Sequence, residues 1–195
     1  MLNEVISEIG RHLGRGCLGF ITKRQTTFLD IALRDAEGEF TVAAYRIHYL
    51  KKLEFSLLGG QFRRIALERD HPLGLDYVEP HQGIYFYGSP DDAHGFLCAL
   101  DEAVRSVFQG WRALDRYLNP CFRSDAALGR ARAGRLLVGP RSLVREVVPL
   151  AEQHGMRFQV FDCCAGDRSS PWVLLLDRMF VVAEGFRAEP REIAS

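Results

Sequence analysis

Two adjacent cysteines, Cys163 and Cys164, are the most unusual group of reactive side chains in the sequence. His154 lies upstream of them, and an imidazole close to a thiol can lower its pKa and make it a nucleophile. This combination predicts a thiol-dependent hydrolase or transferase that uses Cys163 or Cys164. We favour the simpler interpretation, in which one cysteine is buried and the other lies on a loop, because the spacing shows neither an oxyanion donor nor an orienting third group.

Side chains that can ligate a metal ion occur between positions 70 and 94. No two of the histidines have the spacing of three or four residues that is typical of zinc ligands on a helix. Gly14, Gly16 and Gly19 have the spacing of a dinucleotide loop, but they follow a predicted helix rather than a strand, so the context excludes that motif. The sequence therefore predicts no metal ion and no cofactor. The possible ligands are His71, His81, His94, Asp70, Asp76 and Glu79.

The net charge is zero, but acids and bases are separated along the chain. Residues 70–102 contain seven acids and no Lys or Arg. Residues 112–145 contain eight arginines against two aspartates. Arginines can contact phosphates, so the second block allows an RNA-binding protein as an alternative function. Few aromatic side chains accompany these arginines, and nucleic acid is therefore not the expected partner.

The acidic block differs because aromatic side chains are interleaved with it. Tyrosine is enriched at protein interfaces, and a negative surface accelerates association with positive partners. The sequence therefore predicts a non-enzymatic module that neutralises or escorts a basic protein, as a bacterial immunity protein or a chaperone does. The predicted partner-binding residues are Asp70, Asp76, Tyr77, Glu79, Tyr85, Tyr87, Asp91 and Asp92.

The location of the protein is inferred from its cysteines and its hydropathy. No apolar run reaches the ~20 residues of a membrane span, and the first residues lack the basic and apolar regions of a signal peptide. The number of cysteines is odd and their spacing is irregular, which favours reduced thiols over a disulfide framework. We therefore expect a cytoplasmic protein without a membrane partner.

The stretch from Ser89 to Pro120 is predicted to position these residues as one long central helix, at about 89–119. Ser89 is the expected N-cap and Pro90 the first helical residue. Asn119 and Pro120 are expected to end it, because proline cannot continue the hydrogen-bond ladder. Apolar residues at alternating steps of three and four place one stripe along this helix: Leu97, Leu100, Val104, Val107, Trp111, Leu114 and Leu118.

The remaining elements are predicted from shorter patterns. Residues 2–13 are typical of a short amphipathic helix, and alternating runs between 27 and 68 are typical of antiparallel strands, with Gly59-Gly60 as a hairpin turn. We prefer strand for residues 45–58, although the apolar spacing there also allows a helix. The last part of the chain is predicted to be a β-α-β-β-β unit.

Together these patterns predict an α+β fold in which mostly antiparallel sheet packs against the central helix. Residues 1–195 are expected to form a single domain. An alternative is two subdomains, 1–120 and 136–195, joined by an Arg/Gly-rich connection at 121–135.

Overall fold

The computed structural model describes residues 2–57, 60–164 and 170–193. The chain divides into two compact units, each with its own hydrophobic core. Unit 1 consists of Met1–Gly74 and Ser169–Ser195, and unit 2 consists of Leu75–Arg168. Unit 2 is therefore a continuous segment inserted between two parts of unit 1.

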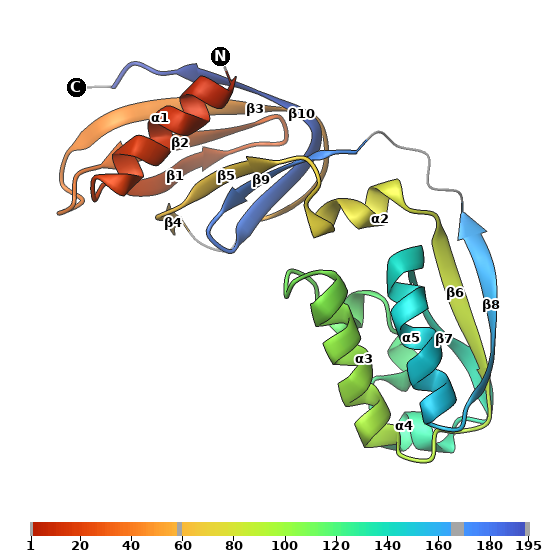
Figure 1. The fold of residues 1–195 in the computed structure, drawn as a ribbon. Coiled ribbons are helices and arrows are strands. Elements are labelled where there is room, and N and C mark those ends of the chain that lie inside the picture. The colour runs from red at the N-terminus through yellow and green to blue at the C-terminus, as the bar shows by residue number, and fades with distance from the viewer. Residues whose placement is uncertain (1, 58–59, 165–169, 194–195) are drawn as a thin grey trace. The chain divides into compact units, whose positions relative to one another are not determined.

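Unit 1 is built on a seven-stranded antiparallel sheet that curves as a half-barrel (Figure 1). The strand order is β4-β1-β2-β3-β10-β9-β5. The two segments of unit 1 therefore join in one sheet, where β3 of the first segment pairs with β10 of the second. The strands are β1 (Leu18–Arg24), β2 (Phe28–Arg34), β3 (Thr41–Ser56), β4 (Gln61–Phe62), β5 (Ile65–Glu68), β9 (Trp172–Leu176) and β10 (Met179–Pro190).

Helix α1 (Leu2–Gly14) packs against this sheet through contacts with β2, β5 and β10. Its apolar residues recur at helical spacing, and Val5 and Ile9 are buried in the core of unit 1. The amphipathic helix predicted at 2–13 is confirmed. Burial of this stripe, rather than helix propensity, stabilises a helix of this length.

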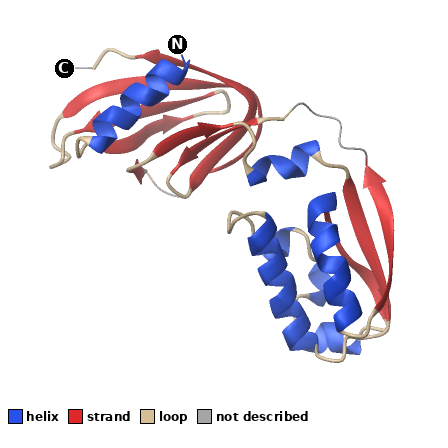
Figure 2. Ribbon diagram, in the orientation of Figure 1, coloured by secondary structure: helices blue, strands red, loops and turns tan. Residues whose placement is uncertain are grey.

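Unit 2 combines a three-stranded antiparallel sheet, in the order β7-β6-β8, with helices on one of its faces (Figure 2). The helices pack on each other and on the sheet, with α5 contacting all three strands. The elements are α2 (Leu75–Val78), β6 (His81–Tyr87), α3 (Ala93–Val107), α4 (Asp125–Arg130), β7 (Ala133–Pro140), α5 (Arg141–Gln153) and β8 (Arg157–Cys164). Short 3₁₀ turns occur at Pro72–Gly74 in unit 1 and at Leu114–Arg116 and Pro120–Phe122 in unit 2.

The central strand β6 shows why one face of this sheet is covered and the other is not. Ile84 and Phe86 are fully buried among the helices, whereas Tyr85 and Tyr87 are 37% and 48% exposed. Successive side chains of a strand point to opposite faces, so the two tyrosines belong to the face away from the helices.

The prediction of one long central helix is wrong. Helix α3 begins at Ala93, three residues after the predicted first residue Pro90. Its N-cap is Asp92 rather than Ser89, and the Asp92 carboxylate accepts a hydrogen bond from the Gly95 N–H. It ends at Phe108, because Gln109 and Gly110 have positive φ angles and the Gly110 N–H bonds back to the Arg105 carbonyl. This left-handed ending closes a helix, and glycine favours it.

The predicted packing of the sheet against that helix is also wrong, because the strands divide between two sheets. The β-α-β-β-β order at the end of the chain is observed, but β7, α5 and β8 join β6 in unit 2 while β9 and β10 join unit 1. Residues 45–56 are strand, within β3. β3 pairs with β2 and β10 rather than with the residues after Gly60, and residue 59 of the expected hairpin turn lies outside the described residues.

The Arg/Gly-rich stretch 121–135 lies inside unit 2, where it contributes the end of a 3₁₀ turn, α4 and the start of β7. The boundaries between the two units fall instead after Gly74 and before Ser169. Among the helices that the structure describes, none combines the length and the apolar composition needed to cross a membrane.

Candidate binding surface

The open face of the unit 2 sheet carries the most exposed aromatic pair in that unit. The rings of Tyr85 and Tyr87 contact each other, with centroids 5.2 Å apart and planes tilted by 55°. On the neighbouring strand β8, the ring of Phe161 lies over Gly83, where a side chain on residue 83 would collide with it. Large rings held on a rigid strand offer contact area without much loss of side-chain entropy on binding.

Arginines flank the tyrosines on both sides. Residues directly opposite each other on antiparallel strands have side chains on the same face. Tyr85 lies opposite Arg135 of β7 and Gln159 of β8, and Tyr87 lies opposite Arg157 of β8. All three neighbours are exposed. We call the set of Tyr85, Tyr87, Arg135, Arg157 and Gln159 the tyrosine face.

A cavity of about 470 Å³ adjoins this face and shares Arg135 with it. Its wall is formed by α2, by the segment 116–120 and by β7, and it combines polar and apolar side chains. The polar ones include Asp76, Tyr77, His81, Arg116, Asn119 and Arg135.

Asp76 at the wall of this cavity is an internal ion-pair partner. Its carboxylate is only 4% exposed and lies 3.0 Å from the Arg112 Nη2 and 3.1 Å from the Arg116 Nε. The Tyr117 hydroxyl donates a hydrogen bond to the same carboxylate at 2.9 Å. Because Arg112 is also buried, at 5%, the two charges compensate each other inside the unit.

Tyr117 connects this ion pair to the core. Its ring stacks on Phe108 at 5.0 Å with planes 10° apart. Burial raises the pKa of Tyr117 far above the usual tyrosine value, and the neighbouring Asp76 carboxylate raises it further. The hydroxyl therefore stays protonated at neutral pH and serves as a hydrogen-bond donor to Asp76.

Three further acids predicted to bind a partner have structural contacts. Glu79 accepts hydrogen bonds from the backbone N–H and the hydroxyl of Ser142, at the start of α5. A carboxylate there also interacts favourably with the helix dipole. Asp92 is the N-cap of α3. The carboxylate of Asp91, an exposed residue, lies beside Gly155.

The predicted site residues are therefore not brought together as one surface. Tyr85 and Tyr87 lie side by side, and Asp76 and Tyr77 line the adjoining cavity. Asp70 is exposed but belongs to unit 1. The tyrosine face also includes Arg135, which the sequence analysis considered only as one of eight arginines in residues 112–145, and Arg157, which it did not consider. The available sequence signal for these arginines was the strand alternation of residues 133–135 and 157–162. Alternation alone does not place them beside the tyrosines, because that also requires the pairing of β7 and β8 with β6.

The three histidines considered as metal ligands lie in different settings. His71 is buried and accepts a hydrogen bond from the Leu73 N–H, and the His81 Nε2 donates to the Asp76 carbonyl. His94 pairs with Asp125. In the described part of the chain, no group of three or more His, Cys, Asp or Glu side chains is arranged to hold a metal ion.

All five cysteines are free thiols, and Cys163 and Cys164 lie exposed at the end of β8. Desolvation and the neighbouring Cys164 raise the pKa of the Cys163 thiol, which disfavours the nucleophilic thiolate. His154 follows α5, and its ring packs against Phe96 at 5.2 Å. Residues 165–169, which continue from the cysteines, lie outside the described residues.

Comparison of the chain with protein-family models, curated proteins and solved structures found no match. The function is therefore argued from the geometry of the molecule alone.

Proposed function

We propose that the protein is a non-enzymatic protein-binding module whose partner docks on the tyrosine face of unit 2. The observation that carries the proposal is the exposure of Tyr85 and Tyr87, in ring contact, on the uncovered face of a sheet whose other face is packed. Exposed tyrosines and arginines on a rigid element are the composition of binding hot spots. The two tyrosines are not part of the core of unit 2, to which β6 contributes Ile84 and Phe86 from its opposite face.

The charges around the tyrosines support an acidic partner surface. Arg135 and Arg157 lie opposite Tyr85 and Tyr87 on the neighbouring strands, and arginine forms bidentate contacts with carboxylates. The prediction of a basic partner relied on free carboxylates in residues 70–92. Asp76 and Glu79 have internal partners instead, so the narrower proposal of an immunity protein or chaperone for a basic protein receives no support from their contacts.

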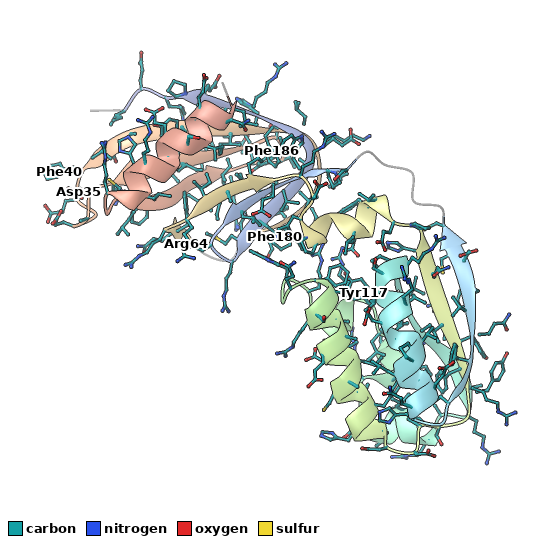
Figure 3. The ribbon with its side chains drawn as sticks, in the orientation of Figure 1. Asp35, Phe40, Arg64, Tyr117, Phe180 and Phe186 are labelled. Carbon is teal, nitrogen blue, oxygen red and sulfur yellow. The ribbon has the colours of Figure 1, made fainter. Side chains whose placement is uncertain are left out.

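The proposal is tested by removing the two rings. The double variant Tyr85→Ala/Tyr87→Ala should still fold, because both side chains are exposed. Phe40→Ala is the matched control, since Phe40 is 69% exposed at the turn between β2 and β3 of unit 1 (Figure 3). Affinity capture from the native cells should retain a protein with the wild type and with Phe40→Ala, and lose it with the double variant.

The captured protein is then purified and its binding measured directly. Truncation of a tyrosine anchor is expected to cost about 2 kcal/mol or more and to act mainly by faster dissociation. Arg157→Glu should slow association at low salt, whereas Arg178→Glu, an exposed arginine of unit 1, should not. Equal affinity of the wild type and the double variant would refute the tyrosine face as the docking site.

The same variants separate a protein partner from RNA. Aromatic side chains flanked by arginines also bind single-stranded nucleic acid, by stacking bases and contacting phosphates. We expect no saturable binding of a fluorescent uridine or adenosine oligonucleotide at physiological salt. Micromolar binding that is lost in Tyr85→Ala/Tyr87→Ala would replace the protein partner with RNA.

A further inference from the structure

A cysteine, a histidine and an aspartate form a connected row on the surface of unit 2. The Cys98 Sγ lies 3.7 Å from the His94 Nε2. The other ring nitrogen of His94, Nδ1, lies 3.0 Å from the Asp125 Oδ2. His94 and Cys98 are four residues apart on α3 and therefore share one face of the helix, while Asp125 is the first residue of α4.

The order of these three groups determines which nitrogen of His94 carries the hydrogen. A carboxylate at neutral pH only accepts hydrogen bonds, so the His94 Nδ1 carries the hydrogen that faces Asp125. In the neutral ring, Nε2 is then the acceptor and points to the thiol of Cys98. This is a nucleophile, a base and a group that orients the base, which is the arrangement that activates nucleophiles in unrelated proteins.

The surroundings of Cys98 limit the chemistry that it can perform. Acyl transfer to sulfur develops negative charge on a carbonyl oxygen and requires donors aimed at that oxygen. Cys98 lies in the interior of a 15-residue helix, where backbone N–H groups are already bonded to carbonyls one turn earlier. Thiol–disulfide exchange needs no such donors, because it requires only a thiolate, a leaving thiol and access.

We propose that Cys98 is a reactive thiol that undergoes thiol–disulfide exchange with disulfides of low molecular mass, with His94 as proton acceptor and Asp125 as the residue that orients it. The Cys98 sulfur attacks one sulfur of the disulfide while its proton passes to the His94 Nε2. A new S–S bond forms, the original S–S bond breaks, and the released thiolate takes the proton from Nε2. The products are a mixed disulfide on Cys98 and one free thiol.

Other charged side chains near Cys98 do not account for the proposed reactivity. Asp101 and Glu102 lie three and four residues further along α3, and Asp101 pairs with Arg105 at 2.8 Å. Neither carboxylate assists attack by the Cys98 sulfur, so without a proton acceptor Cys98 should react no faster than the other exposed thiols. The proposal is independent of the tyrosine face, because none of its residues belongs to that face.

The test uses the full chain, reduced and then exposed to glutathione disulfide at pH 7, with modification of each cysteine followed by peptide mass spectrometry. Cys121, Cys163 and Cys164 are exposed in the same molecule and serve as internal controls. Cys98 should react on the order of tenfold faster than they do, a modest effect for a positioned base. His94→Gln should reduce the Cys98 rate to that of the controls, and Asp125→Asn should reduce it in part. Asp101→Asn, which removes a nearby charge outside the row, should not slow it.

The pH dependence of the reaction rate gives a second readout. The wild-type Cys98 rate should follow a different pH profile from the rates of the other exposed cysteines, and His94→Gln should abolish that difference. A Cys98 rate equal to that of the exposed controls, or a His94→Gln rate equal to that of the wild type, would overturn the proposal. Circular dichroism of each variant establishes that α3 is intact.

Discussion

Two carboxylates in this protein, those of Asp30 and Asp76, are internal partners of arginine. Asp30 in β2 is almost fully buried and accepts two hydrogen bonds from Arg46, at 2.7 and 2.9 Å, and one from Arg191, at 2.8 Å. In unit 2, Asp76 has a comparable setting with Arg112 and Arg116. A buried charge with such partners is costly to break, because the remaining partner is left without compensation.

The contacts of Asp30 predict how unit 1 responds to acid. The hydrogen bonds from Arg46 hold the pKa of Asp30 below its usual value. The carboxylate therefore contributes stability above the unfolded pKa of about 3.9, and that contribution is lost as the pH falls through the lower folded pKa. We expect Asp30→Asn to lower the unfolding free energy at pH 7, and to show a smaller further loss between pH 5 and pH 2 than the wild type.

This prediction is measured by urea unfolding, with the fluorescence of Trp172 in unit 1 recorded in a Trp111→Phe background. Glu184→Gln is the matched control, because Glu184 pairs with Lys51 at the surface. A parallel acid dependence of Asp30→Asn and the wild type would contradict the assignment.

Removal of the Asp76 carboxylate should cause a large loss of stability in unit 2. Asp76→Ala leaves Arg112 buried without its carboxylate, and breaking a buried pair by removing one partner costs about 3–5 kcal/mol. Asp101→Ala removes the partner of Arg105, an exposed residue of the same unit, and should cost below about 1 kcal/mol. The two variants are compared by urea unfolding with Trp111 as the reporter, in a Trp172→Phe background. Similar midpoints for the two variants would show that Asp76 is not a buried partner in solution.

The same contacts explain why part of the site was not predictable. Strand alternation indicated that only some of residues 84–87 are exposed, without showing which, and the exposed ones are Tyr85 and Tyr87. A run of acids, however, does not show which arginines lie beside it in space. Arg112 and Arg116 are more than thirty positions from Asp76, so the acidic block predicted an exposed charge where the fold makes an internal pair.

At the scale of elements, helix α3 shows how a continuous apolar stripe can mislead. The stripe from Leu97 to Leu118 kept helical spacing through Gly110, but Gln109 and Gly110 take left-handed conformations and end the helix. Leu118 instead lies in extended chain beside Leu137 of β7. Apolar spacing reports which residues are buried, and Gly110 was the local signal that the backbone changes direction between them.

The start of α3 gives a prediction that separates the two possible caps. Asp92 accepts a hydrogen bond from the Gly95 N–H at 3.0 Å, and loss of an N-cap side chain costs about 1 kcal/mol. Asp92→Ala should therefore lower the unfolding free energy of unit 2 by about that amount. Ser89→Ala, at the cap expected from sequence, should leave it within about 0.5 kcal/mol. A larger effect at Ser89 than at Asp92, measured by thermal or urea unfolding, would contradict the observed start.

At the scale of the whole molecule, the two units differ in how the chain builds them. Unit 2 is continuous from Leu75 to Arg168, and every described residue of its core belongs to that segment. Unit 1 requires both Met1–Gly74 and Ser169–Ser195, because β9 and β10 lie inside its sheet. Sequence reasoning missed this division, since β9 and β10 follow β8 closely in the chain and no composition change marks the return.

This organisation predicts the behaviour of fragments. A fragment of residues 75–168 should fold alone and give a dispersed amide NMR spectrum with a cooperative thermal transition. A fragment of residues 1–74 should not fold, because the pairing surface of β3 and the core around Val181 and Phe186 are missing. Addition of a peptide with residues 170–193 should restore structure to it. A folded 1–74 fragment, or an unfolded 75–168 fragment, would contradict the two units.

The position of β10 inside the unit 1 sheet also has a consequence in time, during synthesis of the chain. The ribosome makes β3 more than a hundred residues before its partner β10, an interval of many seconds at about 5–20 residues per second. For that interval β3, sixteen residues long, presents a row of unpaired backbone groups, which is the kind of edge on which chains aggregate. All residues of unit 2 are made before β10. Newly made chains therefore pass through a stage in which unit 2 is complete and the sheet of unit 1 is still open. Chaperones that cover exposed strands should act on this protein at that stage.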